Sequence, residues 1–297
     1  MQKVNSSMIS KYTGAVQPKK VRLSPMARIW LLLGVSLLAI VLFMTINLNG
    51  NISYILTHRA YIILTMIIVA FAAGVSTILF QTIANNRILT PSLMGLEALF
   101  VLLQTLFIFF EGDMPASWMA NLTKFFLESA LLVLFSVVLY RWLFSSVRFN
   151  INLVLMIGII LGTLFRSSAT LLQRLMDPNE FSVLQSRMFA TFTRATPDLI
   201  LCALAIIVVV GVLLWRMRYS FDVMALGQAN AINLGINYRK QTTYILLLIS
   251  VLVAVSTALV GPLTFLGLIV ANLAYHISGS SQHRFLMPVA FLLGTIA

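Results

Sequence analysis

Apolar runs long enough to cross a bilayer occur several times in this sequence, with hardly a charged side chain inside any of them. A spanning helix needs about 20 such residues, because it rises about 1.5 Å per residue and the hydrocarbon core is about 30 Å thick. Of all residues, 60% are hydrophobic and 9% charged, whereas an ordinary soluble domain carries roughly a quarter charged residues. The sequence therefore predicts an all-α, polytopic transmembrane helix bundle.

The apolar runs, bounded by turn residues and charges, predict eight helices and the start of a ninth. They cover residues 29–48, 61–83, 92–110, 121–142, 151–172, 199–215 and 241–260, then a short helix at 263–277 and a ninth from Phe285. From Phe285 to Ala297 there are 13 residues, only about 20 Å of helix. We therefore expect the natural C-terminus to be missing from this sequence.

The basic residues predict the orientation of the spans. With the N-terminus in the cytoplasm, 14 lysines and arginines fall on the inner side and 6 on the outer side or within the membrane. Positive charge near span ends is retained in the cytoplasm, so this orientation is favoured over its inverse. We predict a cytoplasmic N-terminal arm at residues 1–28 and a transmembrane domain at 29–297. The net charge of +12 indicates orientation rather than nucleic-acid binding, since the basic residues lie between spans.

Two connections between spans are more than turns. Residues 173–197 contain a helix start at Asp177 to Glu180, which predicts a short helix lying at the outer surface. Residues 216–240 read RMRYSFDVMALGQANAINLGINYRK and form a long inner connection. Its apolar residues are spaced loosely for a helix, with breaks expected at Gly227 and Gly235.

Signatures of enzymatic and ion-coupled chemistry are weak in this chain. A phosphate-binding P-loop needs glycine directly before its lysine, and none of the six lysines follows a glycine. The three histidines have no Cys, Asp or Glu neighbours at metal-ligand spacing. Only Glu97 and Glu128 lie inside predicted spans, and an end-facing carboxylate or an interhelical hydrogen bond is the favoured interpretation of each. We predict no ATPase site, no metal site and no cofactor.

Two arginines lie on the outer half of the fifth predicted helix. Arg166 and Arg174 are candidates for the lining of an anionic pathway, but side chains that snorkel to the outer headgroups are the favoured interpretation. The lone cysteine, Cys202, lies within an apolar run and is interpreted as a small packing residue.

Two stretches near the C-terminus carry a family pattern. One reads ALGQANAINLGI and the other GPLTFLGLIVANLAYHISGSSQHRFLMP, with an apolar helix between them. They resemble the C-terminal half of FecCD-type permeases, the membrane subunits of ABC importers for iron-siderophores, haem and cobalamin. The matching residues are Ala225, Leu226, Gly227, Leu234, Gly235, Gly261, Pro262, Phe265, Gly267, Leu268, His283, Arg284, Leu286 and Pro288.

An earlier stretch agrees with the same family, and together the blocks cover about half of the chain in the family's order. Its matching residues are Arg59, Gly74, Gln81, Pro91 and Gly95. The chain departs from the pattern at Ala271-Asn272, where the family usually has Pro-His, and at Asn85-Asn86, where Asn-Pro is usual. Similar replacements are familiar from permeases for catecholate-type siderophores.

The resemblance implies a ten-span type II ABC importer permease in the inner (plasma) membrane of a bacterium, with the tenth span absent from this sequence. Its implied partners are a dimer of ABC ATP-binding subunits, a second permease subunit that is identical or different, and a substrate-binding protein. The implied cargo is a ferric siderophore; haem and cobalamin are alternatives within the same architecture.

The resemblance also assigns roles to particular residues. The segment that couples to the ATPase includes Asp222, Ala225, Leu226, Gly227, Leu234 and Gly235. Arg59 aligns with an arginine that pairs with a glutamate on the binding protein. Asn150 and Asn152 are inner-gate candidates, with a solvated turn as the competing interpretation. Gly261 and Pro262 break a span, and backbone without a helical partner is tolerated at membrane depth only inside protein or beside a water-filled cavity. They mark either the transport route or a tight re-entry between two spans.

Two other classes of protein compete with an ABC permease. A secondary transporter driven by an ion gradient would explain the broken span, but not the long inner connection or the scarcity of acidic residues within spans. A non-transporting membrane scaffold would explain the hydropathy alone.

Overall fold

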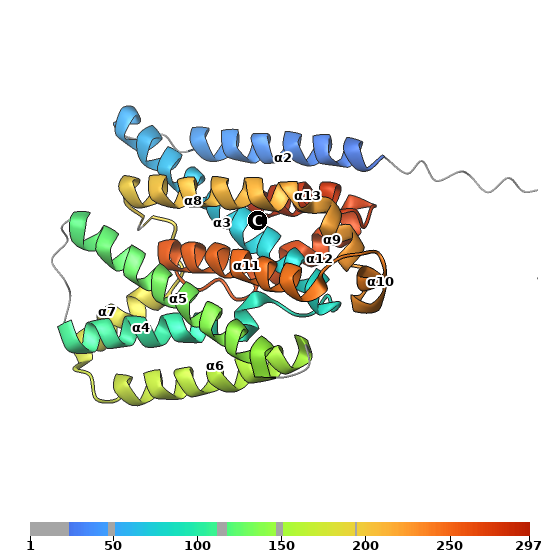
Figure 1. Ribbon diagram of the computed structural model, residues 1–297. Coiled ribbons are helices and arrows are strands. Elements are labelled where there is room, and N and C mark those ends of the chain that lie inside the picture. Colours follow the sequence, from blue (N-terminus) through green and yellow to red (C-terminus); the bar gives the residue numbers. More distant parts are fainter. Residues whose placement is uncertain (1–23, 47–50, 112–117, 147–150, 194) are drawn as a thin grey trace, which may run out of the picture.

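The computed structural model describes residues 24–46, 51–111, 118–146, 151–193 and 195–297 of this chain. Within these ranges every regular element is a helix (Figure 1). The elements are α2 (Pro25–Thr45), α3 (Ile52–Ala84), η1 (Pro91–Met94), α4 (Leu96–Glu111), α5 (Trp118–Ser146), α6 (Ile151–Gln173), α7 (Pro178–Met188), α8 (Pro197–Arg216), α9 (Arg218–Met224), α10 (Gln228–Asn233), α11 (Tyr238–Val260), α12 (Leu266–Ser278) and α13 (His283–Ile296).

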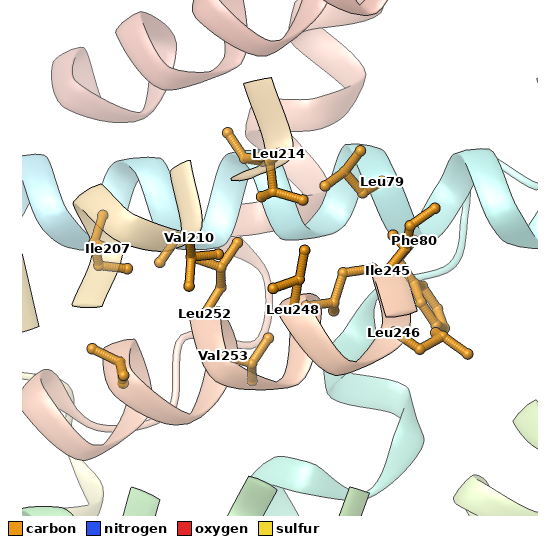
Figure 2. Packing of buried hydrophobic residues seen from close by; sticks show 14 of the residues in the cluster. Leu79, Phe80, Ile207, Val210, Leu214, Ile245, Leu246, Leu248, Leu252 and Val253 are labelled. Atoms are coloured by element: carbon orange, nitrogen blue, oxygen red, sulfur yellow. The ribbon is translucent and has the colours of Figure 1, made fainter. Parts of the chain in front are cut away.

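Two long apolar helices, α3 and α11, form the centre of the bundle. At least two-thirds of the most apolar 18-residue stretch of each is buried, whereas α2, α6 and α8 expose large apolar side chains on the outside. In Figure 2, aliphatic side chains of α8 and α11, among them Val210, Leu214 and Leu248, pack against α3, which contributes Leu79 and Phe80. This arrangement is typical of a membrane protein with several spanning helices, in which the central helices are buried by their neighbours and the outer helices present apolar side chains to the lipid.

Small residues allow α3 to approach α13 closely. A Cβ added at Gly74 of α3 would lie 3.2 Å from the carbonyl oxygen of Ala290, and one added at Gly294 would lie 3.0 Å from the Cβ of Ala70. Small residues at such crossings let helix backbones approach, which gains van der Waals packing where lipid offers no hydrophobic driving force. α3 and α13 therefore pack as a tight pair.

The predicted helices are confirmed in order and position, with differences at their ends. α2 begins at Pro25 because Ser24 caps it, its hydroxyl accepting from the Ala27 N–H at 3.2 Å. α3 begins nine residues before the predicted Tyr61, since Asn51 caps it and the polar residues near Arg59 continue the helix. The predicted helix at 92–110 is divided by Gly95, whose φ of +81° ends η1 before α4 begins.

Five helices are long and apolar enough to cross a membrane among the described residues: α2, α3, α8, α11 and the part of α6 from Met156 to Gln173. Three shorter helices, α4, α12 and α13, are also apolar. The short helix predicted after Asp177 is confirmed as α7; its position at the outer surface stays a prediction. The total of ten spans stays a prediction.

The helices α9 and α10, which belong to a connection predicted to be cytoplasmic, lie at one end of the bundle, on the right in Figure 1. We call this end the inner end and the opposite one the outer end, after the predicted orientation, which stays a prediction. At the inner end, the Nη1 of Arg28 donates to the Ile277 carbonyl at 2.9 Å, which joins the start of α2 to the end of α12. The helix predicted at the outer surface, α7, lies at the opposite end. The two sites described next lie at the inner end and at mid-depth.

Candidate functional site

The inner connection between α8 and α11 folds as two short helices, α9 and α10. Gly227 and Gly235 adopt φ of +90° and +86°, a conformation that glycine takes without a steric penalty. The breaks predicted at these two glycines are confirmed. Leu226, Ile232 and Leu234 are 51% to 61% exposed, so this connection presents an apolar surface outside the predicted spans. We call residues 216–240 the coupling segment.

Asp222 of α9 joins the coupling segment to the start of α13. Its Oδ1 accepts from the backbone N–H of His283 at 2.8 Å and lies 2.7 Å from the Nδ1 of the same residue. The carboxylate thus caps an α13 N-terminal N–H, which has no partner within the helix, and fixes the ring beside it. Phe221 packs edge-on against the imidazole with ring centroids 5.6 Å apart.

His283 extends this contact to α3, because its Nε2 lies 2.8 Å from the hydroxyl oxygen of Thr82. His283 precedes the apolar part of α13, and burial lowers the pKa of its imidazole although the Asp222 carboxylate acts in the opposite direction. The Thr82 hydroxyl also lies 2.9 Å from the Ile78 carbonyl oxygen, and its single proton serves one of these two contacts. We call Asp222, His283 and Thr82 the Asp222 network; it links α9, α13 and α3.

A cavity of about 280 Å³ lies beside the Asp222 network; we call it the smaller cavity. Asn85, Arg87 and Tyr275 line it together with Asp222 and His283. The Arg87 guanidinium lies over the Tyr275 ring, 4.4 Å from its centroid, and the charge–quadrupole attraction fixes α12 to the turn after α3. The inner end is thus held by polar contacts between elements far apart in sequence.

A second cavity of about 560 Å³ lies between α6 and the η1–α4 turn; we call it the larger cavity. α6 approaches this turn closely at glycines: a Cβ on Gly95 would lie 2.9 Å from the Gly158 carbonyl oxygen and 3.0 Å from the Gly162 Cα. Gly162 is the twelfth of the 23 residues of α6, so the contact occurs halfway along a helix of spanning length. Arg166 and Arg174 both line this cavity.

Glu97 forms the buried floor of the larger cavity and is 6% exposed. Its two carboxylate oxygens accept from the hydroxyls of Ser92 at 2.7 Å and of Thr264 at 2.6 Å. Glu97 also lies in the first turn of α4, where the partial positive charge of the helix N-terminus favours a carboxylate. The expected helix-end position is confirmed for Glu97; its partners lie in η1 and in the break between α11 and α12.

The broken span explains how Thr264 reaches Glu97. α11 ends at Gly261, whose φ is +106° and whose N–H donates to the Thr257 carbonyl at 2.8 Å. Pro262 cannot continue the helix, and α12 begins only at Leu266. The intervening residues turn at the cavity, so the break places a hydroxyl on the cavity wall.

The second acidic residue, Glu128 of α5, accepts from the Nε2 of Gln104 on α4 at 2.7 Å, which confirms the expected interhelical hydrogen bond. Lys124 lies one turn earlier, 3.8 Å from the same carboxylate oxygen. Glu128 therefore ties α4 to α5 rather than opening toward the larger cavity.

Arg59 lies at the outer end, where its Nη1 donates to carbonyl oxygens at the end of α2: Phe43 at 2.7 Å, Met44 at 3.3 Å and Ile46 at 2.7 Å. These carbonyls have no partner within the helix. Arg59 thus caps α2 in addition to any role in docking.

The inner-gate candidates are only partly covered by the structure. Asn150 lies outside the described residues, and Asn152 is placed only as the second residue of α6. Among the described residues, no three His, Cys, Asp or Glu side chains converge as metal ligands do.

Sequence reasoning missed the Asp222 network and the Glu97–Thr264 contact. Asp222 and His283 are 61 positions apart, and Glu97 and Thr264 are 167 apart. No spacing rule links such pairs. The one signal in the sequence was that His283, Pro262 and Gly227 all fall on family motif positions.

These features define a class: a helical membrane protein with broken helices around a polar cavity and an apolar contact segment outside its spans. The comparison with known sequences identifies the family. The pattern of the FecCD transport family matches residues 26–297, and the chain belongs to this family.

Two curated relatives are similar over most of the chain. The petrobactin import system permease protein YclO of Bacillus subtilis (strain 168) is 42% identical, covering 91% of this chain and 85% of the relative. The petrobactin import system permease protein FatC of Bacillus anthracis is 37% identical, covering 81% of this chain and 68% of the relative.

A solved structure shows the same fold. It is a metal-chelate type ABC transporter in an inward-facing conformation, with a TM-score of 0.76 at 20% identity, covering 92% of this chain and 87% of the matched chain. At this identity the likeness supports the fold alone.

Proposed function

We propose that this chain is the membrane-spanning permease subunit of an ATP-driven importer that carries a ferric siderophore into the cytoplasm. The observation that carries the proposal is the 42% identity to a petrobactin import permease over nine-tenths of the chain. A ferric siderophore is therefore favoured over haem or cobalamin, and an ABC permease over an ion-coupled transporter.

The coupling segment supports a separate ATPase partner. Leu226 and Leu234 expose apolar surface beside Ala225, Gly227 and Gly235, outside the predicted spans. Helices that present apolar side chains in this way bind grooves on partner proteins. We assign the coupling segment to a groove on an ABC ATP-binding subunit, which places the N-terminus on the same, cytoplasmic side.

The Asp222 network gives this docking a mechanical consequence. A displacement of α9 acts through the Asp222 carboxylate on the start of α13, and through His283 and Thr82 on α3. Because α3 and α13 form a tight pair, they move together. Nucleotide-driven closure of the ATPases would thus shift the two helices of the centre rather than bend a loop.

The remaining roles complete the importer. A second permease subunit, identical or different, faces the larger cavity, and a substrate-binding protein docks near Arg59 at the outer end. The route passes Arg166 and the break at Gly261 and Pro262, and the inner gate lies near Asn150 and Asn152.

The test is reconstitution of the permease with its ATP-binding subunits, second permease and binding protein in vesicles. We expect ATP-dependent uptake of radiolabelled ferric petrobactin, abolished by a catalytic glutamate-to-glutamine change in the ATPase. Uptake by the permease alone, driven by an ion gradient, would refute the proposal in favour of a secondary transporter. Uptake of haem or cobalamin in place of ferric petrobactin would refute the cargo.

A further inference from the structure

One face of α6 carries polar side chains within a helix of spanning length. The α6 stripe comprises Thr163, Arg166, Ser167 and Thr170 of α6 and Arg174, which directly follows the end of the helix; all are exposed and line the larger cavity. Their spacing of three or four residues places them on one side of the helix. The adjacent side is apolar and exposed, with Ile160, Leu164 and Leu171 between 56% and 63% accessible.

The depth of the stripe makes contact with lipid unfavourable. Thr163 lies ten residues, or about 15 Å, before the end of α6, next to the mid-helix Gly162. Arg166 lies about 10 Å before that end. Polar and charged side chains at such depth are costly in lipid and face a water-filled cavity or a protein partner. The Thr163 hydroxyl donates to the Ile159 carbonyl at 2.9 Å within the helix, so the cost falls on the charged Arg166 rather than on the threonine.

Charge is unequally distributed around the larger cavity. The one carboxylate among its lining residues, Glu97, is buried in the floor with both oxygens bonded to hydroxyls. The two guanidinium groups lie on the exposed rim, and arginine stays protonated in proteins. A ligand that passes along the open side therefore meets the two positive charges before it meets Glu97.

We infer that the α6 stripe lines a water-filled part of the passage and selects anionic iron chelates over neutral ones. This rests on the proposed function for the identity of the cargo. A ferric ion held by catecholate or carboxylate oxygens keeps a net negative charge, whereas a ferric trihydroxamate is neutral. Arg166 and Arg174 raise the local concentration of the anionic class, because clefts lined by charge of one sign concentrate ligands of the other.

Cysteine labelling tests the passage without any cargo. The lone cysteine is removed by Cys202→Ala, and Thr163→Cys is compared with Leu164→Cys, its neighbour at the same depth on the apolar face. The assembled importer in proteoliposomes is treated with an anionic and a cationic methanethiosulfonate, and modification of this chain is measured by intact mass. We expect Thr163→Cys to react and Leu164→Cys to stay unmodified. An unreactive Thr163→Cys, or equal reaction at both positions, overturns the water-filled passage.

The ratio of the two labelling rates tests the charge. At Thr163→Cys the anionic reagent should react faster than the cationic one, and Arg166→Gln with Arg174→Gln should lower that preference on the order of tenfold. Arg166→Lys with Arg174→Lys keeps the charge and should preserve the preference. A ratio that does not change in the glutamine variant overturns the role of the arginines.

Uptake then tests the cargo class and separates this inference from the proposed function. The glutamine variant should lose several-fold in uptake of a ferric catecholate, while the lysine variant keeps it. Equal uptake by the wild type and the glutamine variant overturns the selectivity. If the wild type carries no ferric chelate of any kind while the labelling is as expected, the proposed function fails and the positively charged passage stands.

Discussion

The Asp222 network is most directly tested by Asp222→Ala. The change removes the acceptor for two donors, the His283 N–H at 2.8 Å and the His283 ring at 2.7 Å. A buried donor left without a partner costs about 1–3 kcal/mol, and loss of a helix cap costs about 1 kcal/mol. Because His283 is only 1% exposed, water cannot replace the carboxylate at the ring. We expect a loss of about 2–4 kcal/mol in the free energy of unfolding.

The measurement is unfolding of the purified chain in detergent micelles titrated with dodecyl sulfate. Asp222→Asn keeps an acceptor oxygen and should lose only about 1 kcal/mol. The matched control is Asp198→Ala, an exposed acidic residue in the first turn of α8, which should lose at most about 0.5 kcal/mol. A double-mutant cycle of Asp222→Ala with His283→Ala should give an interaction energy of about 0.5–3 kcal/mol. A cycle energy of zero would show that the two residues do not act as a unit.

The same variant should uncouple transport, since the carboxylate is proposed to carry motion from α9 to α13 and α3. In the reconstituted importer, Asp222→Ala should hydrolyse ATP while its uptake per ATP falls several-fold. Wild-type uptake per ATP in a correctly inserted Asp222→Ala importer would refute this mechanism, whatever the change in stability.

Three further variants test other parts of the structure. Gly227→Trp should abolish uptake while the chain stays in the membrane, because it places a large side chain at a φ of +90° in the coupling segment. The control is Gly34→Trp, at an equally open position on α2, which should still transport. Unchanged uptake by Gly227→Trp would count against docking of the coupling segment at this position. Gly95→Ala should destabilise the chain by at least about 2 kcal/mol, because the new Cβ would lie 2.9 Å from the Gly158 carbonyl oxygen at a φ of +81°; wild-type stability in the same dodecyl sulfate titration would show that α6 shifts easily. Arg59→Glu should reduce uptake and be rescued by a Glu→Arg change on the binding protein, with affinity measured by titration; a loss of stability without rescue would leave Arg59 as a cap of α2 alone.

Hydropathy was sufficient to predict the helices because each spanning segment must satisfy its own backbone hydrogen bonds. The breaks at Gly227 and Gly235 were also predictable, since glycine adopts positive φ without strain. The start of α3 was not, because the polar residues around Arg59 read as a loop. In the structure they continue the helix while the Arg59 side chain turns back to cap α2.

The sites were less predictable than the helices. The contact between Glu97 and Thr264 depends on how the start of α4 meets the break between α11 and α12, and a single sequence does not show that the two lie together. Arg166 and Arg174 were singled out by their charge, but the choice between a passage and the headgroups required the cavity that they line. The role proposed for the coupling segment came from the resemblance to a family. The partners of Asp222 became known only from the packing of α9 against α13.

α3 has 33 residues without a proline, which makes it a rod of about 50 Å. Arg59 lies near its outer end and Thr82 near its inner end. A rod without a hinge transmits displacement instead of absorbing it. Under the proposed function, a binding protein that docks outside and an ATPase that moves inside would therefore act on the same helix, and events on the two sides of the membrane would be synchronised through it.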